Sequence, residues 1–372
     1  MRPIKPQTSI LNIPRELWDK AASQKSPFLQ YDFLLALEKS QSIGAGSGWL
    51  PLYFVDEAEN AIFYSFVKSH SYGEYIFDWQ WANAYKQYGM EYYPKLTSMI
   101  PFTPITTSHF LMPAFNAAAV DHLLKSYHEL YQHQNFSSSH FLFLNQDEIP
   151  LFEQQGYLIR HSMQYHFFNQ NYQSFDDYLL HMKGRKAKQV RKERIFPDLK
   201  IQKFSGNDLR PEHALQMYQF YLSTIDQKNA IDYLKQDFFM MVFETMKNNV
   251  MYVQASDAKG PMAGSLFFFD NERLYGRYWG CHAEIENLHF ELCYYQGIDF
   301  CIDQKLKVFE AGAQGEHKIS RGFTPTITYS AHKLKHQQFH SAIANFIAEE
   351  KVQLEAARSE LALQLPFKVL PL

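Results

Sequence analysis

The spacing of apolar residues predicts alternating helices and strands along the first half of the chain. Apolar residues at helical spacing follow a capping serine-proline pair and predict a helix over 31–40. Two apolar runs, at 50–55 and 61–67, flank a polar turn and predict a β-hairpin. The other elements expected in this half are a helix at 120–134, a strand at 140–144, a short helix at 149–155 and a long strand at 157–168.

A second series of elements begins near Ser174. Its expected helices are at 175–182, 211–225, 236–247, 289–304 and 337–363, and its expected strands are at 250–254, 262–269, 273–279 and 307–311. The first three strands are joined by short turns, which is typical of antiparallel pairing. Strands and helices therefore mix in both halves. This pattern predicts an α/β (α+β) fold with two domains, 1–170 and 171–372.

Length and composition indicate the number of domains and the cellular compartment. A chain of 372 residues with 46% hydrophobic and 20% charged residues can build two cores. Its net charge of −3 argues against general binding of polyanions. The three cysteines have no zinc-site spacing and suggest a reducing compartment. With neither a signal sequence nor a long apolar run, the expectation is a cytoplasmic protein without a membrane span, of undetermined oligomeric state.

The segment 183–194 is strongly basic, with seven Lys and Arg residues and one Glu. A solvated basic helix is one interpretation. The other is a phosphate site for tRNA, CoA or a nucleotide-linked substrate, because guanidinium and ammonium groups suit phosphate oxygens. The candidate phosphate-binding residues are Arg185, Lys188, Arg191 and Lys192.

The segment 308–323 carries several acidic, basic and imidazole side chains directly after an expected strand. Acyl transfer to an amine needs a base and a group that stabilises an oxyanion. The candidate catalytic bases are Glu310, Glu316 and His317, and Lys318 and Arg321 could balance a phosphate or an oxyanion. An ion-paired loop that only closes the fold is the alternative interpretation.

Several strings in the chain match a known family. From about Ser26 to the C-terminal helix, the chain resembles the FemAB-like, GNAT-type family of peptidoglycan biosynthesis/recognition proteins. The matching strings are at 73–79, 92–96, 101–104, 274–281, 289–296, 309–318, 321–323 and 328–332, of which FEAGAQGEHK at 309–318 is the strongest. After Pro104 the residues Ile105 to His109 depart from a glycine and an arginine of the relatives, so a cation contact expected there is in doubt.

The resemblance implies tandem GNAT-like domains, each a mixed, mostly antiparallel sheet flanked by helices. It also implies an N-acyltransferase that moves an acyl or aminoacyl group to an amine without a metal or a tightly bound cofactor. The co-substrate would be acyl-CoA or aminoacyl-tRNA. The acceptor would be an amine-bearing small molecule, a peptide or a cell-wall precursor. No glycine-rich pyrophosphate turn lies between Trp279 and His289, which favours aminoacyl-tRNA without excluding CoA.

The remaining candidates are residues expected to bind substrate. These are Asp78, Lys95, Tyr275, Arg277, Tyr278, His289, Glu291, Tyr294, Gln314, Lys318 and Arg321. Core packing explains aromatic positions equally well, and an acid near a helix N-terminus also favours the helix dipole. Cys281 is a possible nucleophile, but a buried inert thiol is the favoured interpretation. Two other functions remain open: a non-catalytic protein that recognises a cell-wall precursor or peptide, and a nucleic-acid-associated protein that uses the basic segment.

Overall fold

The computed structural model describes residues 3–23, 26–313 and 315–369. Its contacts group the chain into two compact units. Unit 1 comprises Met1–Ser162 and Ile327–Glu355, and unit 2 comprises Met163–Thr326 and Ala356–Leu372. The predicted domains, 1–170 and 171–372, stay a prediction. The contacts give other bounds because the chain returns from unit 2 to unit 1 at its last strand.

Unit 1 is built on a mixed sheet. The hairpin of β1 (Trp49–Asp56) and β2 (Ala61–Lys68) is antiparallel, and β2 pairs with both β3 (Lys95–Ser98) and the short β4 (Phe110–Leu111). β3 runs parallel to β5 (Ser138–Leu144), which pairs antiparallel with β12 (Thr324–Leu334). The helices of this unit are α1 (Arg15–Ala21), α2 (Tyr31–Lys39), α3 (Trp79–Gln87), α4 (Ala117–His133), α5 (Ile149–Gln154) and the first part of α12 (Gln337–Ala362).

The core of unit 1 forms where α4 packs on β1 and β2. Tyr127 of α4 makes edge-to-face contacts with Phe63 and Phe141, at 5.1 and 5.5 Å between ring centroids. All three side chains are buried. Such aromatic packing stabilises a core beyond the area it buries, which accounts for much of the aromatic content of this half.

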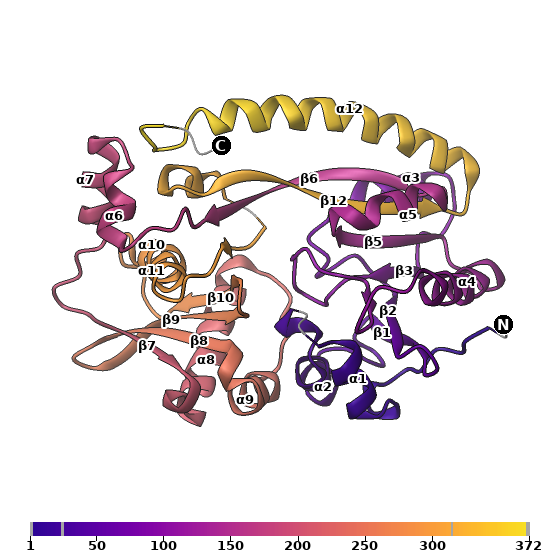
Figure 1. Cartoon of the computed structure of the whole chain (residues 1–372), viewed down its shortest axis with the longest axis horizontal. Helices are drawn as coiled ribbons and strands as arrows, with labels where there is room; N and C mark the ends of the chain where they lie inside the picture. The colour runs from indigo at the N-terminus through magenta and orange to yellow at the C-terminus, as the bar shows by residue number, and fades with distance from the viewer. Residues whose placement is uncertain (1–2, 24–25, 314, 370–372) are drawn as a thin grey trace. The chain divides into compact units, whose positions relative to one another are not determined.

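The strands of unit 2 follow the order β6-β11-β10-β9-β8-β7 and are also of mixed direction. Its strands are β6 (Leu158–Phe168), β7 (Lys200–Ser205), β8 (Val250–Asp257), β9 (Gly260–Phe269), β10 (Arg273–Cys281) and β11 (Val308–Glu310). Neighbouring strands are antiparallel, except that β10 and β11 are parallel. In Figure 1, α8 (Pro211–Lys228) and α9 (Gln236–Thr245) cover one face, whereas α10 (Leu288–Phe290) and α11 (Gln296–Asp303) cover the other.

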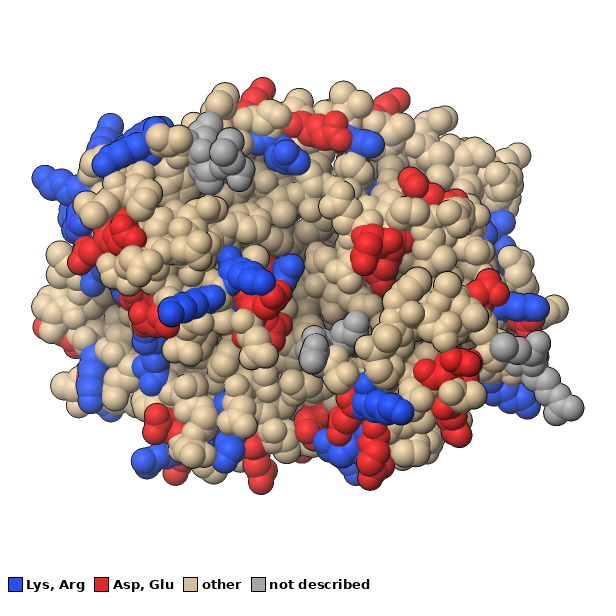
Figure 2. Space-filling model, viewed as in Figure 1, with Lys and Arg blue, Asp and Glu red and all other residues tan. Residues whose placement is uncertain are grey.

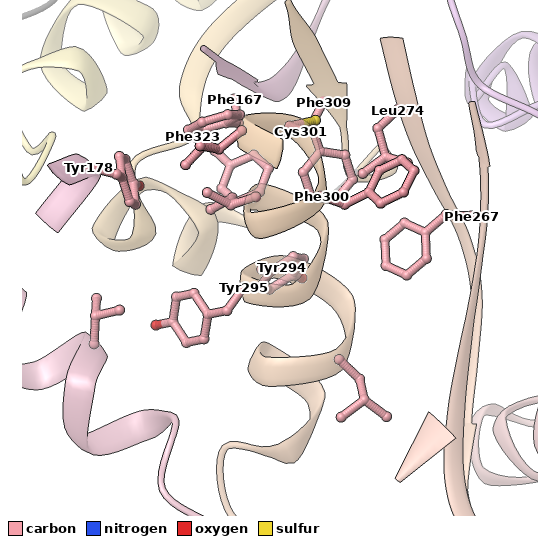
Figure 3. Packing of buried hydrophobic residues seen from close by; sticks show 14 of the residues in the cluster. Phe167, Tyr178, Phe267, Leu274, Tyr294, Tyr295, Phe300, Cys301, Phe309 and Phe323 are labelled. Carbon is pink, nitrogen blue, oxygen red and sulfur yellow. The ribbon is translucent and has the colours of Figure 1, made fainter. Parts of the chain in front are cut away.

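Aromatic side chains fill the core between this sheet and α11. Figure 3 shows Phe267, Leu274 and Phe309 from the strands packed toward the helix that carries Tyr295 and Phe300. The helix predicted over 289–304 is present, and its segment Glu291–Tyr295, between α10 and α11, is π-helical. Single π-turns of this kind are frequent at functional sites.

Candidate functional site

The candidate site lies where two parallel strands of unit 2 separate. The pairing of β10 with β11 ends at Tyr275 and Glu310. Beyond this point the continuing segments 276–279 and 311–313 line a cavity of about 470 Å³, a volume typical of ligand sites. In the pairing of β10 with β9, Gly276 is opposite Phe267 and Tyr278 is opposite Leu266, so Arg277 is a bulged residue. Bulges redirect side chains next to active sites, and here the bulge lies in the cavity wall.

Lys318 is the most unusual charged group of this cavity. Its side chain is 1% exposed, and its Nζ donates a hydrogen bond to the carbonyl oxygen of Gly312 at 2.8 Å. Within the described parts of the chain, no Asp or Glu forms an ion pair with it. Burial disfavours the ammonium and lowers the pKa of Lys318 to about 7, and the nearby Cys293 opposes this shift. A large fraction of this lysine is therefore a neutral amine at neutral pH.

Two histidines stand beside this lysine in the cavity wall. The Nε2 of His317 lies 2.8 Å from the hydroxyl oxygen of Tyr294, and the rings of His289 and His317 are 6.2 Å apart. Burial and the neighbouring His317 lower the pKa of His289 to about 4. Desolvation, then the charges of Lys318 and Arg321, also lower the pKa of His317. Both imidazoles are consequently neutral at neutral pH and able to accept a proton or a hydrogen bond.

Arg321 anchors the loop that carries these groups. It donates to the carbonyl oxygen of His317 at 2.8 Å and to the Oε2 of Glu193 at 2.9 Å. Its guanidinium also stacks 3.3 Å from the ring centroid of Phe290. A planar guanidinium suits such combined bonding and stacking. The predicted substrate-binding role of Arg321 stays a prediction, and its contacts support the short helix Glu316–Arg321 from behind.

Glu310 does not line the cavity. It accepts a hydrogen bond from Arg273 at 2.7 Å and is 3% exposed. Its Oε2 lies 4.0 Å from the Nε2 of His166 and has no hydrogen-bond partner in the described part of the chain. Burial raises the pKa of Glu310, and Arg273 opposes the increase. Because alternate strand residues face opposite sides, Phe309 enters the core and Glu310 points to the other face of the sheet.

The other predicted residues fall into three groups. Arg277, Tyr278, His289, Tyr294, His317 and Lys318 all line the cavity. Tyr275 bonds to Asp270, Glu291 pairs with Arg194, and Glu316 is exposed outside the cavity lining. Gln314 lies outside the described residues. The structure therefore brings six of the candidates into one cavity wall.

Asp78 and Lys95 lie in the core of unit 1. The Nζ of Lys95 is 2.5 Å from the Oδ2 of Asp78 and 2.8 Å from the Oε2 of Glu74, and all three side chains are buried. Burial raises the pKa of Asp78, but the charge of Lys95 is among the effects that outweigh burial, and the pKa falls to about 2. This arrangement is a buried ion-pair network, and the predicted role of the two residues in binding substrate stays a prediction.

The basic segment forms the helix α7 (Gly184–Glu193) at one end of unit 2. Figure 2 shows Lys and Arg side chains gathered over this helix at the upper left. Its four candidate phosphate-binding residues are exposed, whereas Ala187, Val190 and Glu193 face the interior. None of the four lines the cavity. Their binding of phosphate stays a prediction.

Sequence reasoning missed several residues of the cavity wall. These are Thr224, Lys228, Ser265, Trp279 and Cys293. Lys228 and Thr224 come from α8, which is distant in sequence from the 308–323 segment, so no local pattern points to them. Cys281 lies outside the lining, and burial raises the pKa of its thiol, which favours the inert interpretation.

Within 3–23, 26–313 and 315–369, no group of three or more His, Cys, Asp and Glu side chains is placed to hold a metal ion. No helix in those same ranges is long and apolar enough to cross a membrane.

Mixed strands flanked by helices in each unit, with a cavity at the separation of parallel strands in unit 2, define a tandem GNAT-fold protein. The predicted fold class is thereby confirmed. The chain belongs to the FemAB-like family, described as peptidoglycan biosynthesis/recognition, whose model matches residues 9–369. The resemblance stated from the sequence is also confirmed.

Solved structures share this fold at low sequence identity. The C-terminal domain of a putative lysylphosphatidylglycerol synthetase from Agrobacterium fabrum is 8% identical, with a TM-score of 0.55 over 88% of this chain and 95% of that one. FemX is 9% identical, with a TM-score of 0.54 over 89% of this chain and 98% of that one. L-PGS from Bacillus licheniformis is 8% identical, with a TM-score of 0.50 over 85% and 96%. No curated protein sequence matches the chain.

Proposed function

We propose that the protein is an N-acyltransferase that moves an acyl or aminoacyl group onto an amine in the cavity of unit 2. The observation that carries this proposal is Lys318, a buried lysine with a pKa of about 7 in the wall of a cavity between separating strands. A base that is half deprotonated near neutral pH is well matched to proton transfer from an ammonium.

The reaction forms an amide C–N bond and breaks the thioester bond of acyl-CoA or the ester bond of aminoacyl-tRNA. The neutral amine of Lys318 takes a proton from the acceptor ammonium, and the freed nitrogen attacks the donor carbonyl carbon. Backbone N–H groups of β10 beyond Tyr275, where β11 no longer pairs, are suited to hold the oxyanion. As the amide forms, the thiol of CoA or the ribose hydroxyl of tRNA leaves. That leaving group receives the proton held by Lys318, which regenerates the neutral amine. The second proton, which the nitrogen loses as it becomes an amide, passes to solvent.

His317 is a second candidate for the same proton transfer. It is neutral at neutral pH, and its Nε2 meets the hydroxyl of Tyr294 at 2.8 Å. Lys318 is better matched, because a lower pKa makes an imidazole a weaker base. Glu310 and Glu316 lie outside the cavity lining. We therefore propose that His317 and Tyr294 orient the acceptor through hydrogen bonds.

The family description, peptidoglycan biosynthesis/recognition, supports a peptidoglycan precursor or a peptide as the acceptor. A reaction in the cytoplasm is part of this proposal. The structures of similar fold include FemX and a domain of a putative lysylphosphatidylglycerol synthetase, which is consistent with an acyl or aminoacyl transfer. Acyl-CoA and aminoacyl-tRNA both remain candidates for this donor.

A donor screen read by intact mass tests the proposal. Acyl-CoAs and aminoacylated tRNAs are offered separately with amine acceptors that include peptides and cell-wall precursors. One donor class should give an acceptor heavier by the acyl group, and Lys318→Met should abolish that product. Lys259→Met is the matched control, because this lysine is exposed and lies outside the cavity lining. Failure of every donor would contradict the proposal.

A non-catalytic recognition protein is the second candidate function. Among the described residues that line the cavity there is no Asp or Glu, so the site has no carboxylate base. In this case a cell-wall precursor or peptide would bind, and Lys318→Met would alter the affinity with no turnover to lose. Calorimetric binding together with an empty donor screen would support this alternative.

A further inference from the structure

The exposed face of α7 combines cations with apolar side chains at its edges. We call the cations of α7 together with Leu180, Ile195 and Val369 the α7 surface. All of these residues belong to unit 2. Neither the cavity nor the proposed transfer reaction uses them, so their exposure needs another explanation.

The cations of the α7 surface are mostly unneutralised. Arg191 lies 3.4 Å from the exposed Asp176. Among the described residues, no Asp or Glu forms an ion pair with Arg185, Lys188 or Lys192. Since the inward side of the helix is occupied by Ala187, Val190 and Glu193, the outward side carries a dense positive charge. This local charge contrasts with the net charge of −3 of the whole chain.

The apolar members are unusually exposed for their type. The exposed fractions are 64% for Leu180, 68% for Ile195 and 84% for Val369. Isolated exposed apolar residues are common, but a group of them around one basic helix indicates an interaction surface. Leu180 precedes α7 and Ile195 follows it, so the two residues flank the helix at both ends.

Backbone pairing brings the C-terminal member to the same place. Met182 and Phe367 form an antiparallel bridge, and the amide of Lys368 donates to the carbonyl oxygen of His181 at 2.9 Å. The ammonium of Lys368 also donates to the carbonyl oxygen of Leu180 at 2.8 Å. Val369 directly follows Lys368 in the chain, so it lies close to Leu180. Exposed apolar residues that are remote in sequence therefore gather at the start of the basic helix.

We propose that the α7 surface docks on an anionic lipid bilayer. Lys and Arg near such a surface are attracted by its negative potential, and apolar side chains enter the region between headgroups and acyl chains. A nucleic acid would use the cations but would gain little from Leu, Ile and Val. The segment 180–195 also has no Phe, Tyr or Trp on which a base could stack.

Sedimentation with vesicles tests this docking. The full chain is mixed with phosphatidylcholine vesicles with or without about 30 mol% phosphatidylserine, at roughly 0.1 M salt. We expect binding only to the anionic vesicles. The double substitution Lys188→Gln and Lys192→Gln should weaken it roughly 25-fold, because each cation contributes about fivefold.

Two further double variants make the result specific. Leu180→Ser with Ile195→Ser should weaken vesicle binding at least about threefold, because their apolar contacts are lost. Lys20→Gln with Lys39→Gln removes two exposed cations from unit 1 and should leave binding unchanged. All variants alter exposed positions, so unchanged circular dichroism is the check on folding.

Two results would overturn the proposal. One is the absence of binding to the anionic vesicles by the unaltered chain. The other is binding that depends on Lys188 and Lys192 but is indifferent to Leu180 and Ile195. If labelled tRNA then binds through the same cations, the α7 surface is a nucleic-acid site.

Discussion

The ammonium nitrogen of Lys318 lies 2.8 Å from the carbonyl oxygen of Gly312, its one hydrogen bond to a described backbone group. The lysine is buried in a cavity wall and has no carboxylate partner among the described residues. Keeping this amine in the protein costs stability, because its charged form is poorly solvated. A costly group in a cavity is a reasonable candidate for a functional one.

Lys318→Met should stabilise the protein at neutral and acidic pH. The pKa of Lys318 is about 7 in the fold, against a usual value of 10.5. The unfolded chain thus binds more protons between these values, and the penalty is fully present below pH 7 and lost as the pH rises toward 10.5. We expect a gain on the order of 1–3 kcal/mol at pH 6 that shrinks by pH 10, measured by urea unfolding. A variant equally stable to the parent at pH 6 would contradict this cause.

Gly315→Ala should damage the site while sparing the core. Gly315 has a φ of +114°, which L side chains rarely adopt, and an added Cβ would lie 2.5 Å from the His317 ring. The imidazole would have to leave Tyr294. We expect a loss of at least about tenfold in kcat/KM, with a melting temperature lower by only a few degrees. Gly89→Ala is a comparison in unit 1, since it also has a positive φ but open space around it. Equal kinetic losses in both variants would argue against a specific effect on His317.

Glu310→Gln should act on stability more than on turnover. Glu310 is the buried partner of Arg273 and faces away from the cavity. Removing its charge leaves the guanidinium with a weaker hydrogen bond, so we expect a loss of about 1–3 kcal/mol of unfolding free energy. Turnover per folded molecule should stay within about threefold, as judged by active-fraction-corrected kcat. A loss of turnover above about 100-fold at unchanged stability would instead support Glu310 as the base.

Lys95→Met should be severe, because it leaves two buried carboxylates without their shared cation. Glu74 and Asp78 both contact the Lys95 ammonium, and each also has an oxygen without a hydrogen-bond partner among the described residues. We expect a cost of about 3–5 kcal/mol in chemical unfolding. Lys68, which is also buried, stays 3.8 Å from the Oε1 of Glu74. Asp78→Asn in the same chain would therefore leave one cation and one carboxylate and should recover part of this loss. A double variant no more stable than Lys95→Met would argue against charge pairing as the cause.

Much of the fold was predictable from local patterns. The hairpin of β1 and β2, the helix α4 and the strands β8 to β10 follow from apolar periodicity and turn residues. β12 was missed, although part of its sequence was noted as a motif, because polar residues such as Thr328 and Ser330 interrupt its apolar pattern. The π-helical turn was also missed, since it depends on packing and has no sequence signal.

The site was predictable only in part, for a physical reason. The sequence located the 308–323 segment and six of the cavity residues, but it could not show where β10 and β11 separate. It also grouped Glu310 with His317 by their proximity in sequence. Strand alternation, which sends Phe309 into the core, already implies that Glu310 faces away from it. Contributions from α8, such as Lys228, required the tertiary structure.

The pH dependence of transfer by the unaltered chain and by Lys318→Met tests the central claim most directly. With a donor and acceptor that react, kcat/KM of the unaltered chain should increase about tenfold per pH unit below a midpoint near 7 and level off above it. Lys318→Met should lose at least about 100-fold and show no such midpoint. Undiminished transfer by Lys318→Met with the same pH profile would contradict the assignment of this lysine as the base.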